Sequence, residues 1–371
     1  MKVLILAAPS STHTVKWVRS LSLKGIEIFL FGLTDYNVND YAALKNFYIF
    51  SSKLNKEIFS LPETALSKLG YLKSLPKIKK IIKEFKPDIL HAHYASSYGI
   101  LAALTNFHPM IISVYGSDVF NFPNTNIFSS FVFKFNLSKA DRILSTSQIM
   151  AEETNKYTAK KIEVTPFGID TTVFKHIQVN SIFERGNIVI GTIKALENKY
   201  GIKYLLLAFK YLKEKYSDSP LKLLIVGEGS QENYLKRFSE ELNINEDTVF
   251  TGYIKHEEVP KYHNMIDIFV SLSIEESESF GVAVLEASAC ERPVIVSDAG
   301  GLPEVVENNK TGFIVEKKNY TEAASAIGRL LKDPNIRRQM GINGRERVKK
   351  FYNWNDNVAQ MINIYSDMLN G

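Results

Sequence analysis

Short apolar runs alternate with longer stretches of helical periodicity in the first half of the chain. Residues 3–8 form an apolar run of the kind that a strand covered on both faces requires. Residues 12–24 place Val15, Val18 and Leu21 at helical spacing and stop before Gly25, a common helix end. The pattern further predicts strands at 26–31, 89–93, 110–114 and 142–145, and helices at 78–86, 97–106 and 127–139. This alternation, with few hairpin turns, favours a parallel sheet with helices on both faces.

The alternation stops near residue 166 and restarts at residue 188. The intervening segment is polar and has no period. Strands are then predicted at 188–192, 221–226, 248–251, 268–271 and 294–297, with helices at 204–215, up to 241, and at 257–265, 280–290 and 322–332. We therefore predict an α/β protein with two doubly wound domains, residues 1–175 and 188–354, joined by a linker at 176–187. The length of 371 residues agrees, because it exceeds what one hydrophobic core usually holds.

Two such sheets imply a ligand between the domains, because open α/β sheets bind ligands outside the carboxyl ends of their strands. The architecture alone leaves dehydrogenases, epimerases, phosphorylases, transferases and two-lobed binding proteins open. Composition narrows the choice little, since 45% hydrophobic and 23% charged residues are ordinary for a soluble globular protein. A net charge of +5 is too small to indicate a nucleic-acid partner, and we expect none.

Cysteine content and the apolar segments bear on location. The single cysteine, Cys290, excludes an internal disulfide and stands in an alanine-rich stretch, as a buried core thiol would. The apolar run at the start is short and leads at once into Pro9, which favours a first strand over a signal peptide. The sequence has no apolar segment long enough to span a bilayer. We expect a cytoplasmic protein.

Lysines crowd one stretch of the first domain. Ile78, Ile81 and Phe85 give this stretch an apolar face. A basic amphipathic helix of this kind can lie on the anionic inner face of a membrane. A solvated helix face packed on a sheet explains the same pattern and is the favoured interpretation. The stretch Lys68–Lys86 contains Lys68, Lys73, Lys77, Lys79, Lys80, Lys83 and Lys86.

The strongest local signal for chemistry lies at residues 275–286. A predicted strand ends near Leu272, an acidic turn follows, and a helix opens near Gly281. Free amides at a helix start bind phosphate, and a glycine there permits close approach. Two carboxylates would repel a diphosphate, so Glu278 and Glu286, at most about 12 Å apart along a helix, are expected to reach past it to hydroxyls. An acid-capped helix start explains the segment equally well.

Other segments decide between these interpretations. The 275–286 segment resembles the Glu-x7-Glu motif of retaining glycosyltransferases of family 4, which have the GT-B fold. Residues 191–202, 226–229, 251–253, 293–306 and 311–313 extend the resemblance across the second domain. Each segment alone is a weak signal, but together they are specific.

The resemblance implies a donor site for a nucleoside-diphosphate sugar. It assigns Lys194 and Lys199 to the diphosphate, Glu286 to the ribose hydroxyls and Glu278 to the transferred sugar. A lysine is a point charge without the fork of the arginine that the family often carries. The other donor-binding residues implied are Gly227, Gly229, Gly252, Tyr253, Ser279, Phe280, Gly281 and Val282.

The first domain resembles the family less closely, at residues 87–94 and 113–119. Family members commonly carry a histidine, thought to contact the reacting sugar, where Tyr115 stands. Either Tyr115 contributes its hydroxyl, or His93 or Asp118 fills that role. His91 and His93 share one strand face; we favour one of them reaching the cleft over packing at the strand end.

Two further segments, near the start and the end of the chain, add expectations. The glycine-rich loop that the family has after its first strand is replaced by residues 9–14, in which Ser11 and His13 are candidates on the acceptor side. Simple N-capping by Ser or Thr is the alternative. At the other end, a helix starting at 351–354 and running to 369 would, by resemblance, cross back to the first domain, so residues 355–371 are assigned to that domain.

We therefore predict a retaining, nucleotide-sugar-dependent glycosyltransferase of hexosyltransferase type. Its acceptor would be a polysaccharide or a lipid-linked saccharide, with bacterial surface-polysaccharide assembly as the setting. No cofactor and no metal are expected, because the sequence has no Asp-x-Asp pair and the lysines can replace a cation. The alternatives are a GT-B nucleotide-sugar epimerase and a catalytically silent scaffold. A dinucleotide oxidoreductase is poorly supported, since the segment 227–229 lacks the third glycine of that fingerprint.

Overall fold

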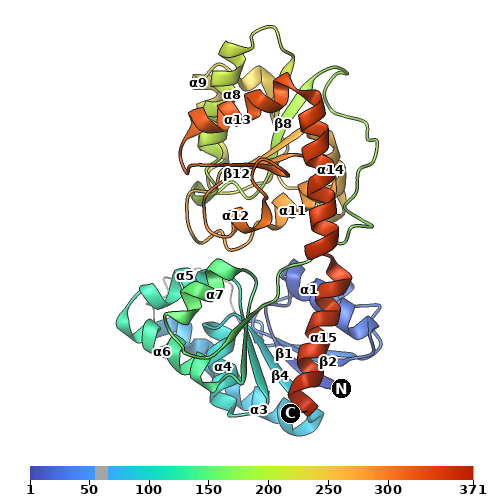
Figure 1. Cartoon of the computed structure of the whole chain (residues 1–371). Coiled ribbons are helices and arrows are strands. Elements are labelled where there is room, and N and C mark those ends of the chain that lie inside the picture. Colours follow the sequence, from blue (N-terminus) through green and yellow to red (C-terminus); the bar gives the residue numbers. More distant parts are fainter. Residues whose placement is uncertain (55–65, 371) are drawn as a thin grey trace. The chain divides into compact units, whose positions relative to one another are not determined.

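Two parallel β-sheets organise the chain (Figure 1). The structure, a computed structural model, describes residues 1–54 and 66–370, with the backbone alone for 66–69. These residues form two compact units: unit 1 comprises Met1–Pro166 and Asp356–Gly371, and unit 2 comprises Phe167–Asn355. Residues 176–187, predicted as a linker, lie within unit 2.

The sheet of unit 1 is parallel throughout its described strands. The central strands are rich in apolar residues and buried over almost their whole length, because helices cover both faces of the sheet. The strand order is β3 (Phe47–Ser51), β2 (Glu27–Gly32), β1 (Lys2–Leu6), β4 (Ile89–His93), β5 (Met110–Val114), β6 (Arg142–Ser145) and β7 (Ile162–Val164).

Helices pack on this sheet in layers. Helices α3 (Leu75–Phe85), α4 (Ser97–Thr105) and α6 (Ile127–Lys139) lie side by side, with α4 between the other two (Figure 1). The other helices among the described residues of unit 1 are α1 (Thr12–Leu23), α5 (Ser117–Phe120), α7 (Gln148–Asn155) and α15 (Trp354–Asn370). Helix α15 joins unit 1 through the fully buried Tyr365.

Unit 2 repeats this plan with a second parallel sheet. Its described strand order is β10 (Thr248–Phe250), β9 (Leu221–Val226), β8 (Ile188–Ile193), β11 (Ile268–Ser271), β12 (Val294–Ser297) and β13 (Gly312–Val315). Its helices are α8 (Ile202–Lys215), α9 (Glu232–Glu241), α10 (Val259–Met265), α11 (Val282–Ala289), α12 (Leu302–Val305), α13 (Tyr320–Lys332) and α14 (Pro334–Phe351).

In both sheets the strand order reverses beside the first strand. Strand β1 lies between β2 and β4, and β8 lies between β9 and β11. Such a switch point separates the loops on its two sides and makes room for a ligand at the carboxyl ends of the strands. The predicted α/β class with two doubly wound sheets is confirmed.

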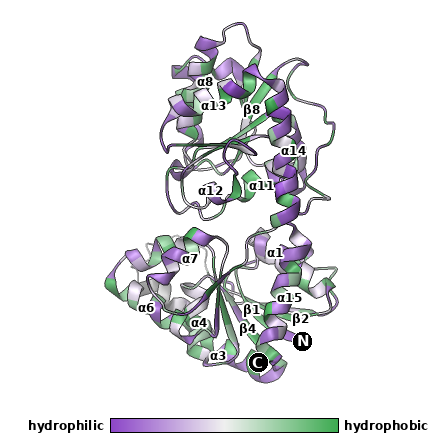
Figure 2. Cartoon of the chain, viewed as in Figure 1, coloured by the Kyte–Doolittle hydropathy of each residue, from purple (hydrophilic) through white to green (hydrophobic). Residues whose placement is uncertain are grey.

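Each unit has its own hydrophobic core. The apolar strands stand out in green in Figure 2, and large side chains such as Phe133 in unit 1 and Phe209 in unit 2 are fully buried. Among the described residues, none of the helices combines the length and the apolar character needed to cross a membrane.

The end of the chain differs from the prediction at one point. Phe351, expected to begin the last helix, is the final residue of α14, and α15 begins at Trp354 after a break. The break is stabilised by Ile169, whose N–H donates to the carbonyl of Tyr352 (2.7 Å) and whose carbonyl accepts from the N–H of Trp354 (3.1 Å). These two bonds satisfy backbone groups that a continuous helix would have satisfied internally.

Candidate functional site

The switch point of unit 2 brings two of the predicted site residues together. Lys194 follows β8, and Glu278 lies in the loop between β11 and α11. Lys194 Nζ is 2.6 Å from Glu278 Oε2, and the two side chains are only 17% and 8% exposed. Ser273 Oγ donates a further hydrogen bond to the same carboxylate oxygen (3.1 Å). A largely buried ion pair therefore joins the loops on the two sides of the switch point.

A tyrosine ring holds the second predicted lysine close by. Tyr200 ends a 3-10 turn after β8, and its ring centre lies 4.3 Å from Lys194 Nζ and 5.0 Å from Lys199 Nζ. Cations favour the face of an aromatic ring. The N–H of Ile274 donates to the carbonyl of Lys199 (2.8 Å) and so fixes this turn to the loop after β11. Two ammonium groups thus gather at the switch point.

The start of α11 provides backbone donors in the same loop. Gly281 precedes the helix with a φ of +95°, and the helix begins at Val282. The first amides of a helix have no partner within it and favour an anion. Phe280 is buried against Phe167 and Tyr352, at ring-centre distances of 6.0 and 5.8 Å, and this packing anchors the helix start.

Glu286 lies farther along α11 above a buried histidine. The residue is 8% exposed, and His263 Nε2 of α10 is 3.5 Å from its Oε2. This distance is at the limit of a hydrogen bond, and within the described part of the chain neither ring nitrogen of His263 has a hydrogen-bond partner. His263 was not among the predicted site residues, because nothing in its sequence surroundings connects α10 with Glu286.

Glycines let the surrounding loops touch through their backbones. A Cβ on Gly227 would lie 2.0 Å from the carbonyl oxygen of Lys194, and one on Gly229 would lie 2.5 Å from that of Leu196. Gly227 also donates its N–H to the carbonyl of Gly252 (3.1 Å). Three of the predicted donor-site glycines therefore build the loops that position Lys194, whereas the neighbouring Tyr253 is 68% exposed.

The loop that carries Glu278 is held in the same way from β12. A Cβ on Gly300 would lie 2.1 Å from the carbonyl oxygen of Glu278, which also accepts a hydrogen bond from the N–H of Gly301 (2.8 Å). Glu276 accepts a hydrogen bond from the N–H of Gly300 (2.8 Å) and pairs with Lys317. Ser279, a predicted donor-binding residue, is half-buried. Its two neighbours are both fixed in place, Glu278 by these contacts and Phe280 by its ring packing.

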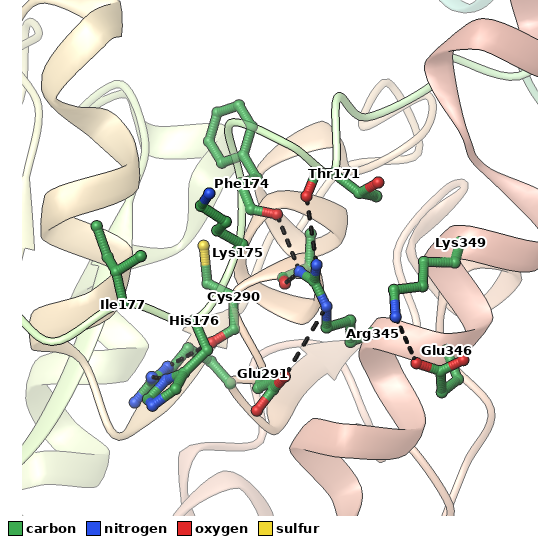
Figure 3. A network of polar contacts seen from close by, with 12 residues as sticks. Thr171, Phe174, Lys175, His176, Ile177, Cys290, Glu291, Arg345, Glu346 and Lys349 are labelled. Atoms are coloured by element: carbon green, nitrogen blue, oxygen red, sulfur yellow. Dashed lines mark hydrogen bonds and ion pairs between the residues drawn. The ribbon is translucent and has the colours of Figure 1, made fainter.

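Arg345 of α14 fixes the other end of α11 (Figure 3). Its guanidinium donates to the carbonyl of Ala289, the last residue of α11, and to the carbonyls of Phe174 (3.1 Å) and Thr171 (3.3 Å). It also lies 3.8 Å from Glu291. A cation at a helix C-terminus satisfies carbonyls that have no partner within the helix. Helix α11, with Glu286, is therefore anchored at both ends.

Unit 1 gathers a second set of predicted residues at its own switch point. His93 ends β4, and its ring packs edge-on against that of Tyr115 at 5.1 Å. Burial, with a smaller electrostatic contribution from His13, lowers the pKa of His93 to about 3. Burial likewise raises the pKa of Tyr115 well above its ordinary value of 10. Both side chains are therefore neutral at pH 7.

Asp118 accepts hydrogen bonds from its own loop and from the loop after β4. Its Oδ1 accepts from the N–H groups of Tyr115 (3.1 Å) and Gly116 (2.9 Å), and its Oδ2 accepts from Ala95 (2.8 Å). Burial raises the pKa of this carboxyl, and the hydrogen bonds oppose that shift. The contacts assign Asp118 to holding the Tyr115 loop, and a direct catalytic role stays a prediction.

His91 belongs to a buried hydrogen-bonded chain. Its Nδ1 lies 2.7 Å from the hydroxyl of Tyr365 on α15, and its Nε2 lies 2.8 Å from the hydroxyl of Ser113. Ser113 also hydrogen-bonds the side chain of Tyr115. Both ring nitrogens of His91 are therefore occupied by these contacts. Of the two histidines on this strand face, His93 is the one in contact with Tyr115.

The remaining predictions concern the acceptor side, metals and the basic stretch. Ser11 occupies the N-cap position of α1 without a capping bond from its side chain, so the capping alternative is not realised there. The described residues contain no group of three side chains placed to hold a metal ion, and the expectation of no metal stays a prediction. The side chain of Lys68 lies outside the described residues, while Lys73, Lys79, Lys80, Lys83 and Lys86 are exposed and Lys77 is partly buried. Both interpretations of that stretch stay open.

Comparisons with known proteins cover both units. Residues 2–147 match a family model described as "Glycosyl transferase 4-like", and residues 174–347 match one described as "Glycosyl transferases group 1". N-acetyl-alpha-D-glucosaminyl L-malate synthase of Bacillus anthracis is 29% identical over 79% of this chain and 78% of its own length. The capsular polysaccharide biosynthesis glycosyltransferase CapM of Staphylococcus aureus is 28% identical over 80% of this chain and 81% of its own length.

The fold is also that of solved structures. The crystal structure of Anabaena HepE in complex with UDP matches with a TM-score of 0.80 at 16% identity, and the match covers 99% of this chain and 100% of that one. The expected GT-B fold is thereby confirmed.

The glycine contact beneath Glu278 yields a test of how the site is held. Gly300→Ala places a methyl group against the carbonyl of Glu278 and also strains a left-handed residue, so we expect a loss of more than about 2 kcal/mol in the free energy of unfolding. Gly252→Ala is the matched control, because Gly252 is also left-handed but has open space around its Cβ position. It is expected to lose only about 1–2 kcal/mol. Equal losses in urea unfolding would show that the contact with Glu278 is unimportant.

The buried histidines yield a pH dependence. The pKa of His93 is about 3 and that of His91 is well below 6.5, so the unfolded chain binds more protons than the folded one between pH 3 and 6.5. Stability is therefore fully present above pH 6.5 and falls as the pH drops through this window, by up to about 1.4 kcal/mol per pH unit for each histidine. Urea unfolding at pH 7 and 5.5 measures the slope. His93→Gln should reduce the slope of stability against pH. An unchanged slope in that variant would show that His93 does not cause the pH dependence.

Proposed function

We propose that this chain, which belongs to the family 4-like glycosyltransferases of the GT-B fold, transfers a sugar from a nucleoside diphosphate to a saccharide acceptor with retention of anomeric configuration. The observation that carries the proposal is the pair of Lys194 and Glu278 at the switch point of unit 2, beside Lys199 and the start of α11. Cations, backbone donors and a carboxylate are there within one set of loops.

The positive groups suit the leaving diphosphate. Negative charge builds on the diphosphate as the glycosidic bond to it breaks, and fixed cations and amide donors stabilise that charge in the transition state. Lys194, Lys199 and the first amides of α11 supply these groups. When a phosphate oxygen takes over Lys194, the carboxylate of Glu278 becomes available to accept hydrogen bonds from the hydroxyls of the transferred sugar.

Glu286 suits the ribose of the donor. A carboxylate can accept a hydrogen bond from each of two adjacent hydroxyls. The buried His263 behind it and the anchored ends of α11 limit its movement. We assign Gly227, Gly229, Gly252 and Tyr253, on the loops after β9 and β10, to the nucleoside side of the same site.

The state of the unit 1 residues favours a mechanism without an enzymic base. A base is most effective when its pKa lies near the working pH, and a pKa of about 3 makes His93 a poor proton acceptor at pH 7. Tyr115 is a protonated phenol that can donate a hydrogen bond to a sugar hydroxyl. The leaving phosphate then takes the acceptor proton on the front face of the sugar, which also explains retention. Ser11 and His13 are assigned to the acceptor.

The relatives suggest the donor and the setting. HepE has been crystallised with UDP and with UDP-glucose, and CapM is named for capsular polysaccharide biosynthesis. We propose a UDP-sugar as donor, a polysaccharide or lipid-linked acceptor, and action at the inner face of a bacterial membrane in the assembly of a surface polysaccharide. The basic residues within Lys68–Lys86 would contribute to contact with that membrane.

Substitution of the donor residues tests the proposal. Lys199→Ala removes a cation from the diphosphate, and Glu286→Gln weakens the hydrogen bonds to ribose. Each is expected to lower kcat/KM by at least about 100-fold, the effect of losing one stabilising group in a transition state. Product formation from UDP-sugars measures the rate. The rise in melting temperature that UDP gives the wild type should shrink in both variants, because a bound ligand stabilises the folded state.

The control is Lys332→Ala, which removes an exposed lysine from the last turn of α13 and should leave turnover unchanged. Near-wild-type turnover in Lys199→Ala or in Glu286→Gln would refute the site.

A further inference from the structure

The outward face of α6 in unit 1 is apolar. Ile127, Phe128 and Phe131 are 90%, 62% and 68% exposed, and among the described residues no large apolar side chain is more exposed than Ile127. A helix on the surface of a globular protein ordinarily presents polar residues to solvent. Exposed apolar patches on such a surface mark sites of interaction. Figure 2 shows the green end of this helix at the edge of the unit.

The opposite face of α6 is also apolar and fully packed. Phe133 and Leu137 are completely buried in the core of unit 1, and α6 packs along α4. Asn126 caps the helix by accepting a hydrogen bond from the N–H of Ser129 (2.8 Å). The orientation of α6 is therefore fixed, and the apolar side chains on its outer face are not needed for the core.

The charged residues within this helical segment are positive. Residues 119–140 contain Lys134 and Lys139 and no aspartate or glutamate. The exposed Lys134 lies two turns beyond Ile127 on the outer side of the helix, and Lys139 Nζ lies 5.8 Å from the ring centre of Phe135. Lys160 adds a third cation at the C-terminal end of α6, where it donates to the carbonyls of Ser138 (2.6 Å) and Ala140 (2.5 Å).

We propose that this α6 face, formed by Ile127, Phe128, Phe131, Lys134 and Lys139, docks unit 1 on an anionic lipid surface. Aromatic and aliphatic side chains at one end of a helix enter the boundary between headgroups and acyl chains, and lysines beside them attract lipid phosphates. Helix α3, with its exposed lysines, belongs to the same helix layer and adds to the positive charge (Figure 1).

A second copy of the chain fits this face less well. In a two-fold symmetric contact the same patch meets itself, so the lysines of both copies would lie near one another. Residues 119–140 contain no carboxylate to pair with them. A lipid surface provides both kinds of partner that this face requires: negative headgroups for the lysines and an apolar interior for the apolar side chains.

Vesicle binding tests the docking in the absence of donor and acceptor, so its result is independent of the transfer reaction. The full chain is sedimented with vesicles of phosphatidylcholine containing phosphatidylglycerol, and with vesicles of phosphatidylcholine alone. The wild type is expected to bind the anionic vesicles more tightly. The double variant Phe128→Ser/Phe131→Ser should bind them at least about tenfold more weakly, because two large apolar side chains no longer enter the bilayer.

Two further variants distinguish the effect of the lysine charges from the effect of exposed apolar side chains in general. Lys134→Glu/Lys139→Glu should abolish the preference for anionic vesicles. Leu23→Ser is the matched control, because Leu23 on α1 is 81% exposed and lies outside the α6 face, so binding should be unchanged. Circular dichroism checks that each variant is folded.

Three outcomes would overturn the proposal. The first is a wild type that shows no preference for anionic vesicles. The second is a serine double variant that binds them as well as the wild type does. The third is a wild-type dimer in sedimentation equilibrium that the serine substitutions convert to a monomer, because this would assign the α6 face to a second copy.

Discussion

Main-chain atoms of neighbouring loops touch one another at the carboxyl edge of the sheet in unit 2, at positions where a side chain would collide with backbone. A Cβ on Gly201 would lie 1.9 Å from the carbonyl oxygen of Leu272, and Gly227 and Gly300 stand in the same relation to the carbonyls of Lys194 and Glu278. Backbone packed on backbone leaves little room for rearrangement. The 2.6 Å ion pair between Lys194 and Glu278 depends on this constraint, because each partner stands on a loop that a glycine contact fixes.

The two units place opposite kinds of chemistry at their switch points. In unit 2 the groups are charged: two lysines share one tyrosine ring, and two glutamates flank a helix start. In unit 1 burial keeps His91, His93 and Tyr115 neutral. Charged groups suit a nucleoside diphosphate, and neutral hydrogen-bonding groups suit the hydroxyls of a sugar. This division supports the proposed assignment of the donor to unit 2 and of the acceptor to unit 1.

Much of the fold could be predicted from the sequence, and the failures have physical causes. Central strands and helices such as α6 have strong periodicity, and the limits predicted for α6 and β4 are those observed. The strands β3, β7 and β13 at the sheet edges were not predicted, because short edge strands carry a weaker apolar signal. Helix α14 was not predicted, because Gly341 and Gly344 form part of its buried face. Glycine adds little hydrophobicity, so this face gives a weak periodic signal.

For the site, the sequence identified residue types but not their partners. The motif positions indicated Lys194 and Glu278 separately, and only the fold shows that they pair. His263 under Glu286 and Tyr365 on His91 were not predicted, because each contact joins elements remote in the chain, in the second case by 274 residues. Such contacts depend on tertiary packing, which no local pattern encodes.

A crystal structure of the chain with UDP bound tests the proposed donor site most directly. The proposed donor site requires the diphosphate beside Lys194, Lys199 and the N–H of Val282, with the ribose hydroxyls on Glu286 and with Lys194 no longer paired to Glu278. UDP bound elsewhere in the molecule, with the pair of Lys194 and Glu278 unchanged, would contradict it.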